Sequence, residues 1–283
     1  SRRKLVKTIE SEEGELLDEA LIKSDERALR ELYLDKGYWN SRVESEILRE
    51  EGIRSAVVVF LIVENERRKI RKILFEGNKH LSSRFLRKQM ESAPWRFWRF
   101  WSKRSRYRPN VLEEDLESLR ASYRDEGFLD VVIEEGGVEI LKQGNSVLDL
   151  VIHLTEGKRS YVGRINVTGN TVLSAEEILK AAKLREGDVY SPSLLTEDRG
   201  RIRKLYGEDG YLDARIAAVR KPNLETGRID VTFDITENNK FTVNSILVRG
   251  NEKTRTIAIV RELALSPGEI FDLRRMETSE ARL

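Results

Sequence analysis

The chain contains no cysteine. This absence excludes disulfide bonds, thiolate nucleophiles and cysteine-ligated metal or iron–sulfur sites. Histidine is nearly absent too, and neither His80 nor His153 lies near a zinc-protease or serine-hydrolase motif. We interpret both histidines as structural, and predict no cofactor, no metal site, no catalytic residues and no enzymatic activity.

Long apolar runs and an excess of either charge are also missing. The longest apolar run, Ala56 to Val63, is far shorter than the roughly 20 residues that a membrane helix needs. The amino end has no apolar segment typical of a signal peptide, so the chain as given is expected to be soluble. The 51 Lys+Arg against 49 Asp+Glu give no reason to expect a nucleic-acid partner.

What the chain does have is a repeat. Its 35% of charged residues favour several small domains over one large core. A strand-like run that ends in Gly-Asn occurs at residues 69–78, 161–170 and 241–251. A glycine followed by an aromatic residue recurs in step with it, at Gly37, Gly127 and Gly210.

Other residue types keep a fixed distance from this second glycine. Counted back from it, tyrosine recurs four residues away, arginine seven and aspartate twelve: Tyr33, Tyr123 and Tyr206; Arg30, Arg120 and Arg203; Asp25, Asp115 and Asp198. We interpret the arginines as structural, through a salt bridge or packing of the side-chain stem, and not as a repeated anion site.

Local patterns assign elements within one unit. Ser174 and Glu177 form a capping-box signature that predicts a helix after the Gly-Asn turn. A second helix is predicted from Leu116, Leu119 and Tyr123, which lie on one face at spacings of three and four. This helix is predicted to end at the glycine before the aromatic residue, because glycine adopts the left-handed conformation without penalty. Alternating apolar and polar residues at 228–237 then predict a half-buried strand, so each unit reads β-α-α-β-β.

The chain therefore divides into four predicted repeats. The first repeat, residues 1–68, lacks the first strand. The second repeat, residues 69–159, and the third repeat, residues 160–240, are complete. The fourth repeat, residues 241–283, stops inside its second helix, so the chain is expected to be a fragment of a longer array.

The order strand, Gly-Asn, two helices, Gly-aromatic, two strands resembles the POTRA domain, and tandem units resemble the BamA family of outer-membrane assembly factors. The resemblance implies an α+β fold, with tandem three-stranded mixed sheets that each carry two helices on one face. It implies a periplasmic region tethered to the outer membrane through a carboxyl-terminal barrel. The implied partners are unfolded outer-membrane proteins, accessory assembly lipoproteins and that barrel, with no nucleic acid.

The resemblance also implies a binding site. In the family the second strand is an exposed sheet edge, which can pair with the backbone of a passing extended chain. The corresponding segments here are Arg42 to Leu48, Leu129 to Glu134 and Asp213 to Val219. The candidate peptide-binding edge is the middle one, which comprises Leu129, Asp130, Val131, Val132, Ile133 and Glu134.

A second candidate is an aromatic and basic stretch in the connection between the helices of the second repeat. Its residues are Trp95, Phe97, Trp98, Arg99, Phe100 and Trp101. We interpret about half of these rings as core residues and the rest as a docking patch for a partner or a lipid surface, because burying five rings of roughly 150 to 250 Å² each in one loop is difficult. Base stacking is the least favoured interpretation.

Two alternatives to an assembly factor stay open. One is the POTRA region of a related translocation or secretion transporter. The other is a KH-like RNA-binding array, which shares a β-α-α-β core but needs a GxxG loop between its helices. The loops between the predicted helices contain no GxxG, which disfavours RNA binding.

Overall fold

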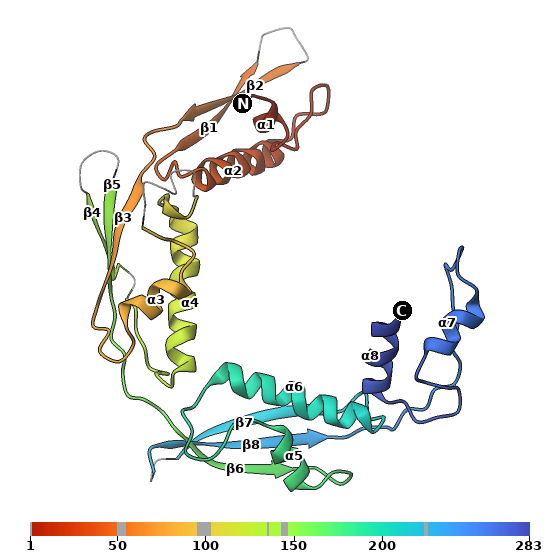
Figure 1. The fold of residues 1–283 in the computed structure, drawn as a ribbon. Helices are drawn as coiled ribbons and strands as arrows, with labels where there is room; N and C mark the ends of the chain where they lie inside the picture. Colours follow the sequence, from red (N-terminus) through yellow and green to blue (C-terminus); the bar gives the residue numbers. More distant parts are fainter. Residues whose placement is uncertain (1, 50–54, 95–102, 135, 143–146, 224–225) are drawn as a thin grey trace. The chain divides into compact units, whose positions relative to one another are not determined.

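The computed structural model describes residues 2–49, 55–94, 103–134, 136–142, 147–223 and 226–283. The chain forms two compact units, one of Ser1–Tyr123 with Asp130–Gly157 and one of Arg124–Leu129 with Lys158–Leu283. Each unit has its own sheets and helices (Figure 1). Within the described ranges, no helix combines the length and the apolar character needed to span a membrane.

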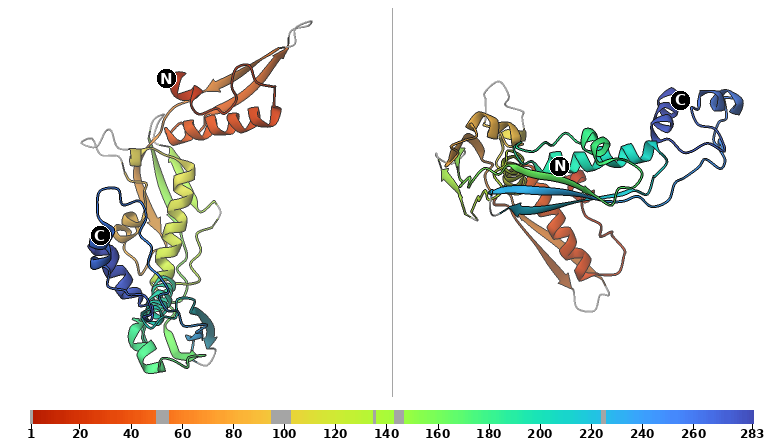
Figure 2. Two further views of the ribbon diagram at one scale, coloured as in Figure 1. Left: turned by 90° about the vertical axis from the view of Figure 1, so that its right-hand side faces the viewer. Right: turned by 90° about the horizontal axis from the view of Figure 1, so that it is seen from below.

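The first compact unit begins with a helix-covered hairpin. Its elements are α1 (Arg2–Val6), α2 (Glu19–Asp35), β1 (Arg42–Arg49) and β2 (Ala56–Val63). The two strands pair antiparallel, and α2 runs alongside them (Figure 2, left). Asp18 caps α2 by accepting hydrogen bonds from the first free amides of the helix.

A three-stranded sheet follows in the same unit. Its elements are β3 (Lys69–Glu76), α3 (Ser83–Gln89), the short 3-10 helix η2 (Lys103–Ser105), α4 (Pro109–Asp125), β4 (Val138–Lys142) and β5 (Val147–His153). The strand order is β3-β5-β4, with β3 parallel and β4 antiparallel to the central strand. The apolar face predicted for the second helix is confirmed at Leu119 and Tyr123, which are fully buried on α4.

The second compact unit repeats this arrangement. Its elements are β6 (Val162–Thr168), α5 (Ala175–Ala181), α6 (Pro192–Glu208), β7 (Arg215–Asn223) and β8 (Arg228–Thr236). The strand order is β6-β8-β7, again mixed. Both helices and the sheet share one core around Tyr190, Tyr206 and Phe233. The predicted capping box of Ser174 and Glu177 is present, and the α+β class with three-stranded mixed sheets is confirmed.

The glycine predicted to end the second helix has the expected conformation. Gly127 and Gly210 both have φ of 88°. A Cβ at Gly127 would lie 2.8 Å from the carbonyl oxygen of Ser160, and one at Gly210 would lie 3.1 Å from that of Phe241. Glycine is therefore needed twice over, for the left-handed turn and for the close passage of the chain that follows.

The last segment differs from its prediction. It contains α7 (Thr256–Glu262) and α8 (Leu273–Arg282), but residues 241–251 form no strand within the described part of the chain. Their β contact is a single bridge between Thr242 and Ile270. The strand expected here was wrong because a strand is stabilised by a ladder of bonds to a neighbour, and these residues have only that bridge.

Candidate functional site

The longest uninterrupted edge in a three-stranded sheet is β7 of the third repeat. In an antiparallel pair, residues alternate between those that bond to the neighbouring strand and those that point away from it. The carbonyl oxygen of Ile216 accepts a hydrogen bond from Arg199 Nε on α6 at 2.9 Å, so it points away from β8. By alternation, the backbone groups of Ala218 and Arg220 also point away from β8. Pro222 continues the series at a position where no N–H is needed.

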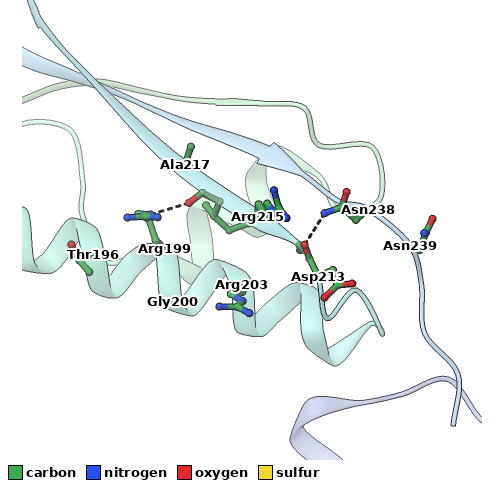
Figure 3. Close-up of a pocket in the computed structure, with 11 residues that line it drawn as sticks. Thr196, Arg199, Gly200, Arg203, Asp213, Arg215, Ala217, Asn238 and Asn239 are labelled. Atoms are coloured by element: carbon green, nitrogen blue, oxygen red, sulfur yellow. Dashed lines mark hydrogen bonds between the residues drawn. The ribbon is translucent and has the colours of Figure 1, made fainter.

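A groove of about 1000 Å³ lies between α6 and this edge (Figure 3). On the helix side no side chain projects into the groove at Gly200, where an added Cβ would meet no atom within 4 Å. On the strand side it is lined by residues 213–217. The figure shows Arg199 reaching from α6 to the strand across this space. The groove therefore gives an extended chain access to part of the outer edge of β7.

The groove is positively charged. Its lining includes Arg199, Arg203 and Arg215 against one carboxylate, Asp213. Among the described residues, no carboxylate lies within ion-pair distance of Arg203 or Arg215. Three guanidinium groups around one groove favour an anionic group in any bound segment.

The candidate edge of the second repeat is shorter than predicted. Leu129 to Glu134 forms no continuous strand, and its only ladder contact is a bridge between Val132 and Thr155. The strand itself is β4, which begins at Val138. A turn, closed by a hydrogen bond from Gly137 N to Glu134 O, separates the bridge at Val132 from the start of β4. The extra residues in this turn shift the pairing register, as a β-bulge does.

Side chains from the second helix cover this edge as well. Arg120 Nη2 donates to the carbonyl oxygen of Ile133 at 2.8 Å in the second repeat. In the first repeat Glu26 accepts from the backbone N–H of Ser45 at 3.1 Å. Together with Arg199 and Ile216, each of the first three repeats therefore has one outward backbone group bonded to its own helix. Sequence reasoning missed these helix-to-edge hydrogen bonds, because the helix residue that forms the bond differs in type or in position from one repeat to the next.

The predicted docking patch, Trp95 to Trp101, lies outside the described residues. It therefore stays a prediction. The structure explains one of the three recurring arginines, Arg30, Arg120 and Arg203. Arg120 donates to the Ile133 carbonyl oxygen and forms an ion pair with Glu117 at 2.6 Å, which fits the structural interpretation.

The aspartate that recurs twelve residues before the helix-ending glycine, here called the aspartate column, hydrogen-bonds the second helix of each repeat to the connection that precedes it. Asp25, Asp115 and Asp198 are all buried, and each accepts bonds from two successive backbone amides. For Asp198 these donors are Lys183 N at 2.7 Å and Leu184 N at 2.9 Å. The fourth repeat has Ser279 in this column, and its Oγ accepts a single bond from Ala264 N. The recurrence of aspartate was the signal, but the sequence did not show its partners.

The tyrosine that recurs four residues before the helix-ending glycine, here called the tyrosine column, hydrogen-bonds a carboxylate that follows the last strand of its repeat. Tyr123 donates to Glu156 at 3.1 Å, and Tyr206 donates to Glu237 at 2.9 Å. Burial alone would raise the pKa of Glu237, but bonds from Thr171, Val172 and Tyr206 outweigh it and lower that pKa to about 2. The same bonds fasten the turn after the first strand to the last strand.

The two histidines lie beside carboxylates. His80 Nδ1 is 2.6 Å from Glu156 Oε2, in the same cluster as Tyr123. His153 Nδ1 is 3.2 Å from Glu76. The part of the chain that the structure describes has no group of three or more acidic or histidine side chains that could hold a metal ion.

The repeated sheets, each covered by helices from one side, define the class of this protein. The family described as POTRA, surface antigen variable number repeat, matches residues 1–65, 68–157 and 160–238. These matches span most of the chain, so it belongs to the POTRA family. Over nearly its whole length it is similar to the BamA type of POTRA protein.

Two such relatives are named outer membrane protein assembly factor BamA. The one from Nitratidesulfovibrio vulgaris is 25% identical over 99% of this chain and 35% of its own length. The one from Neisseria meningitidis serogroup B is 25% identical over 96% of this chain and 34% of its own length. The chain thus spans about a third of these curated relatives.

A solved structure supports the fold. The crystal structure of Haemophilus influenzae BamA POTRA3-5 matches with a TM-score of 0.56 and 20% identity, over 77% of this chain and 85% of that one. The likeness confirms the architecture of the repeats.

Proposed function

We propose that this chain is the periplasmic binding and scaffold region of an outer-membrane β-barrel assembly factor. It captures extended segments of unfolded outer-membrane proteins at the edges of its sheets and docks accessory lipoproteins, while a carboxyl-terminal barrel tethers it to the outer membrane. The name of its relatives supports the setting. The observation that carries the mechanism is β7, a continuous edge strand beside a groove that reaches its outward group at Ile216.

Edge pairing explains how one surface can serve many substrates. The incoming chain bonds through its backbone, so its side chains matter little to affinity. Such capture is weak and reversible, which suits a protein that must release its substrate. The role is one of binding and alignment, and it requires no catalytic residue.

Proline substitution at β7 tests this role. Ala218→Pro removes an outward N–H, so the third repeat should keep its fold and lose at least about fivefold in affinity for a barrel-strand peptide of about ten residues. Ala217→Pro removes an N–H that points to β8 and should destabilise the repeat. Ala218→Val keeps the N–H and should bind as the parent does. Fluorescence anisotropy and circular dichroism measure both effects, and unchanged binding by folded Ala218→Pro would overturn capture at β7.

The second repeat allows the same comparison at the edge predicted from sequence. Val132 N donates to Thr155 O at 2.9 Å, so Val132→Pro should damage the ladder. Ile133 has the opposite orientation, and Ile133→Pro should fold. Loss of peptide cross-linking in Ile133→Pro would assign capture to this edge too. Cross-linking equal to the parent would exclude it and leave the Trp95 to Trp101 patch as the candidate of this repeat.

A further inference from the structure

The third repeat differs from the other two at the helix position that faces the edge strand. Ten residues before the glycine that ends the second helix, the first repeat has Arg27, the second has Glu117 and the third has Gly200. Gly200 has no neighbour within 4 Å of its would-be Cβ. Helix stability does not call for glycine there, since alanine would stabilise an exposed helix interior by about 1 kcal/mol. The absence of a side chain keeps the groove open.

The strand side follows the same trend. Ala217 and Ala218 occupy the places that Glu44 and Ser45 occupy in the first repeat. Gly200 on α6 and Ala217 on β7 both line the space of about 1000 Å³ beside β7. A long side chain at position 200 would extend into this space and lie in the path of an incoming backbone.

The charge next to the edge also differs between the first and third repeats. Arg199 stands where the first repeat has Glu26. The acidic residue covers a backbone donor, Ser45 N–H, whereas Arg199 covers a backbone acceptor, Ile216 O. Arg199 is exposed and its bond is a single one, so an incoming N–H can replace it at the carbonyl.

Displacement leaves the Arg199 guanidinium free next to the bound chain. A carboxylate on that chain would then accept from Arg199, with Arg203 and Arg215 lining the same groove. Asp213 offsets one of the three positive charges, so the groove keeps a positive balance for an acidic segment. A lysine at the same place would be repelled.

We propose that the α6–β7 groove of the third repeat selects extended segments that carry carboxylates, with Arg199 as a displaceable cap on the edge. This rests on the proposed capture of extended chains and adds the class of segment that the groove takes. The first repeat, with Glu26 and Glu44 at its edge, does not share the preference.

Three peptides test the selection. They have one length and one apolar alternation, and differ only in two polar positions that hold Glu, Gln or Lys. The parent chain should bind the Glu peptide about tenfold more tightly than the Gln peptide at low salt, and the Lys peptide most weakly. Added salt should reduce the difference. Equal binding of the Glu and Gln peptides would overturn charge selection and leave capture intact; binding of none of the three would overturn both.

Substitutions then assign the effect to this groove. The triple variant Arg199→Gln/Arg203→Gln/Arg215→Gln should still bind the Gln peptide and lose most of the preference for Glu. Gly200→Gln should fill the groove and weaken all three peptides, whereas Gly200→Ala, a matched control, should bind as the parent does and melt no lower. A Glu preference that survives the arginine substitutions, or tight binding by folded Gly200→Gln, would place the site elsewhere and overturn the proposal.

Discussion

The first and third repeats have the same sequence columns but use them in different surroundings. In both, a residue of the second helix reaches the edge strand, from α2 to β1 and from α6 to β7. Glu26 bonds an N–H in one and Arg199 bonds a carbonyl oxygen in the other. The fold thus sets where helix and edge meet, whereas the residue type decides which backbone group is covered and which charge borders the edge.

The carboxylate at the end of the last strand shows a second difference. Glu237 accepts from Tyr206 and from the turn after β6, at residues 171 and 172. Glu64 also accepts from its tyrosine, Tyr33, at 3.0 Å, but it is exposed. The first repeat as described has no first strand whose turn could bind Glu64. The same pair of residues therefore closes a network in one repeat and forms a single bond in the other.

The largest expected effect is at the aspartate column. Asp198→Ala leaves two backbone amides without an acceptor, one of them buried, and should cost the third repeat about 3 kcal/mol. Asp25→Ala should cost the first repeat only about 1 kcal/mol, because the amides of Glu10 and Ser11 are partly exposed to water. Native-state hydrogen exchange measures each repeat separately. Equal losses would show that burial of the donors does not distinguish the repeats.

An effect of intermediate size is expected on the stability of the third repeat at acidic pH. The pKa of Glu237 is about 2 in the folded repeat against an ordinary 4.5, so its contribution to stability is complete above about pH 4.5 and is lost as pH falls towards 2. After solvent screening this amounts to about 1–2 kcal/mol. Glu237→Gln should flatten this part of a stability profile measured by urea unfolding. A profile that stays steep in Glu237→Gln would contradict the assignment.

The smallest effect isolates the cap on the first edge. Glu26→Ala should speed hydrogen exchange at the Ser45 amide by about fivefold, corresponding to about 1 kcal/mol, because that N–H points away from β2 and bonds to Glu26. Glu46→Ala, on the exposed side of β1, should leave that amide unchanged. An unchanged rate in Glu26→Ala would mean that the strand protects Ser45 without its helix.

Local signals predicted much of this fold from sequence. The capping box at Ser174 and the apolar stripe with Leu119 and Tyr123 set the helices, because their partners lie within one or two turns. The alternation at 228–237 set β8 for a similar reason. Leu129 to Glu134 was misassigned as a full strand because β-propensity counts residue types, whereas the turn at Gly137 decides where pairing resumes.

The site was less accessible to sequence reasoning. The edge positions in the first and third repeats were predicted through the resemblance, but the bonds from Glu26, Arg120 and Arg199 join residues that lie 13 to 19 positions apart. The groove is open at Gly200 because glycine has no side chain and no neighbouring side chain fills the space, and no sequence motif indicates this. Only the packed structure brings these features together.

The parallel pairing of first and last strands has a mechanical consequence. The chain enters the third repeat at β6 and leaves it at β8, and these strands are parallel neighbours. Tension applied along the chain would slide β6 against β8 and load all their hydrogen bonds simultaneously, in shear. The antiparallel β1–β2 hairpin, pulled from its two ends at Arg42 and Val63, would instead unzip one pair at a time. A force that pulls on this chain would therefore meet a stiff element in the third repeat and a yielding one in the first.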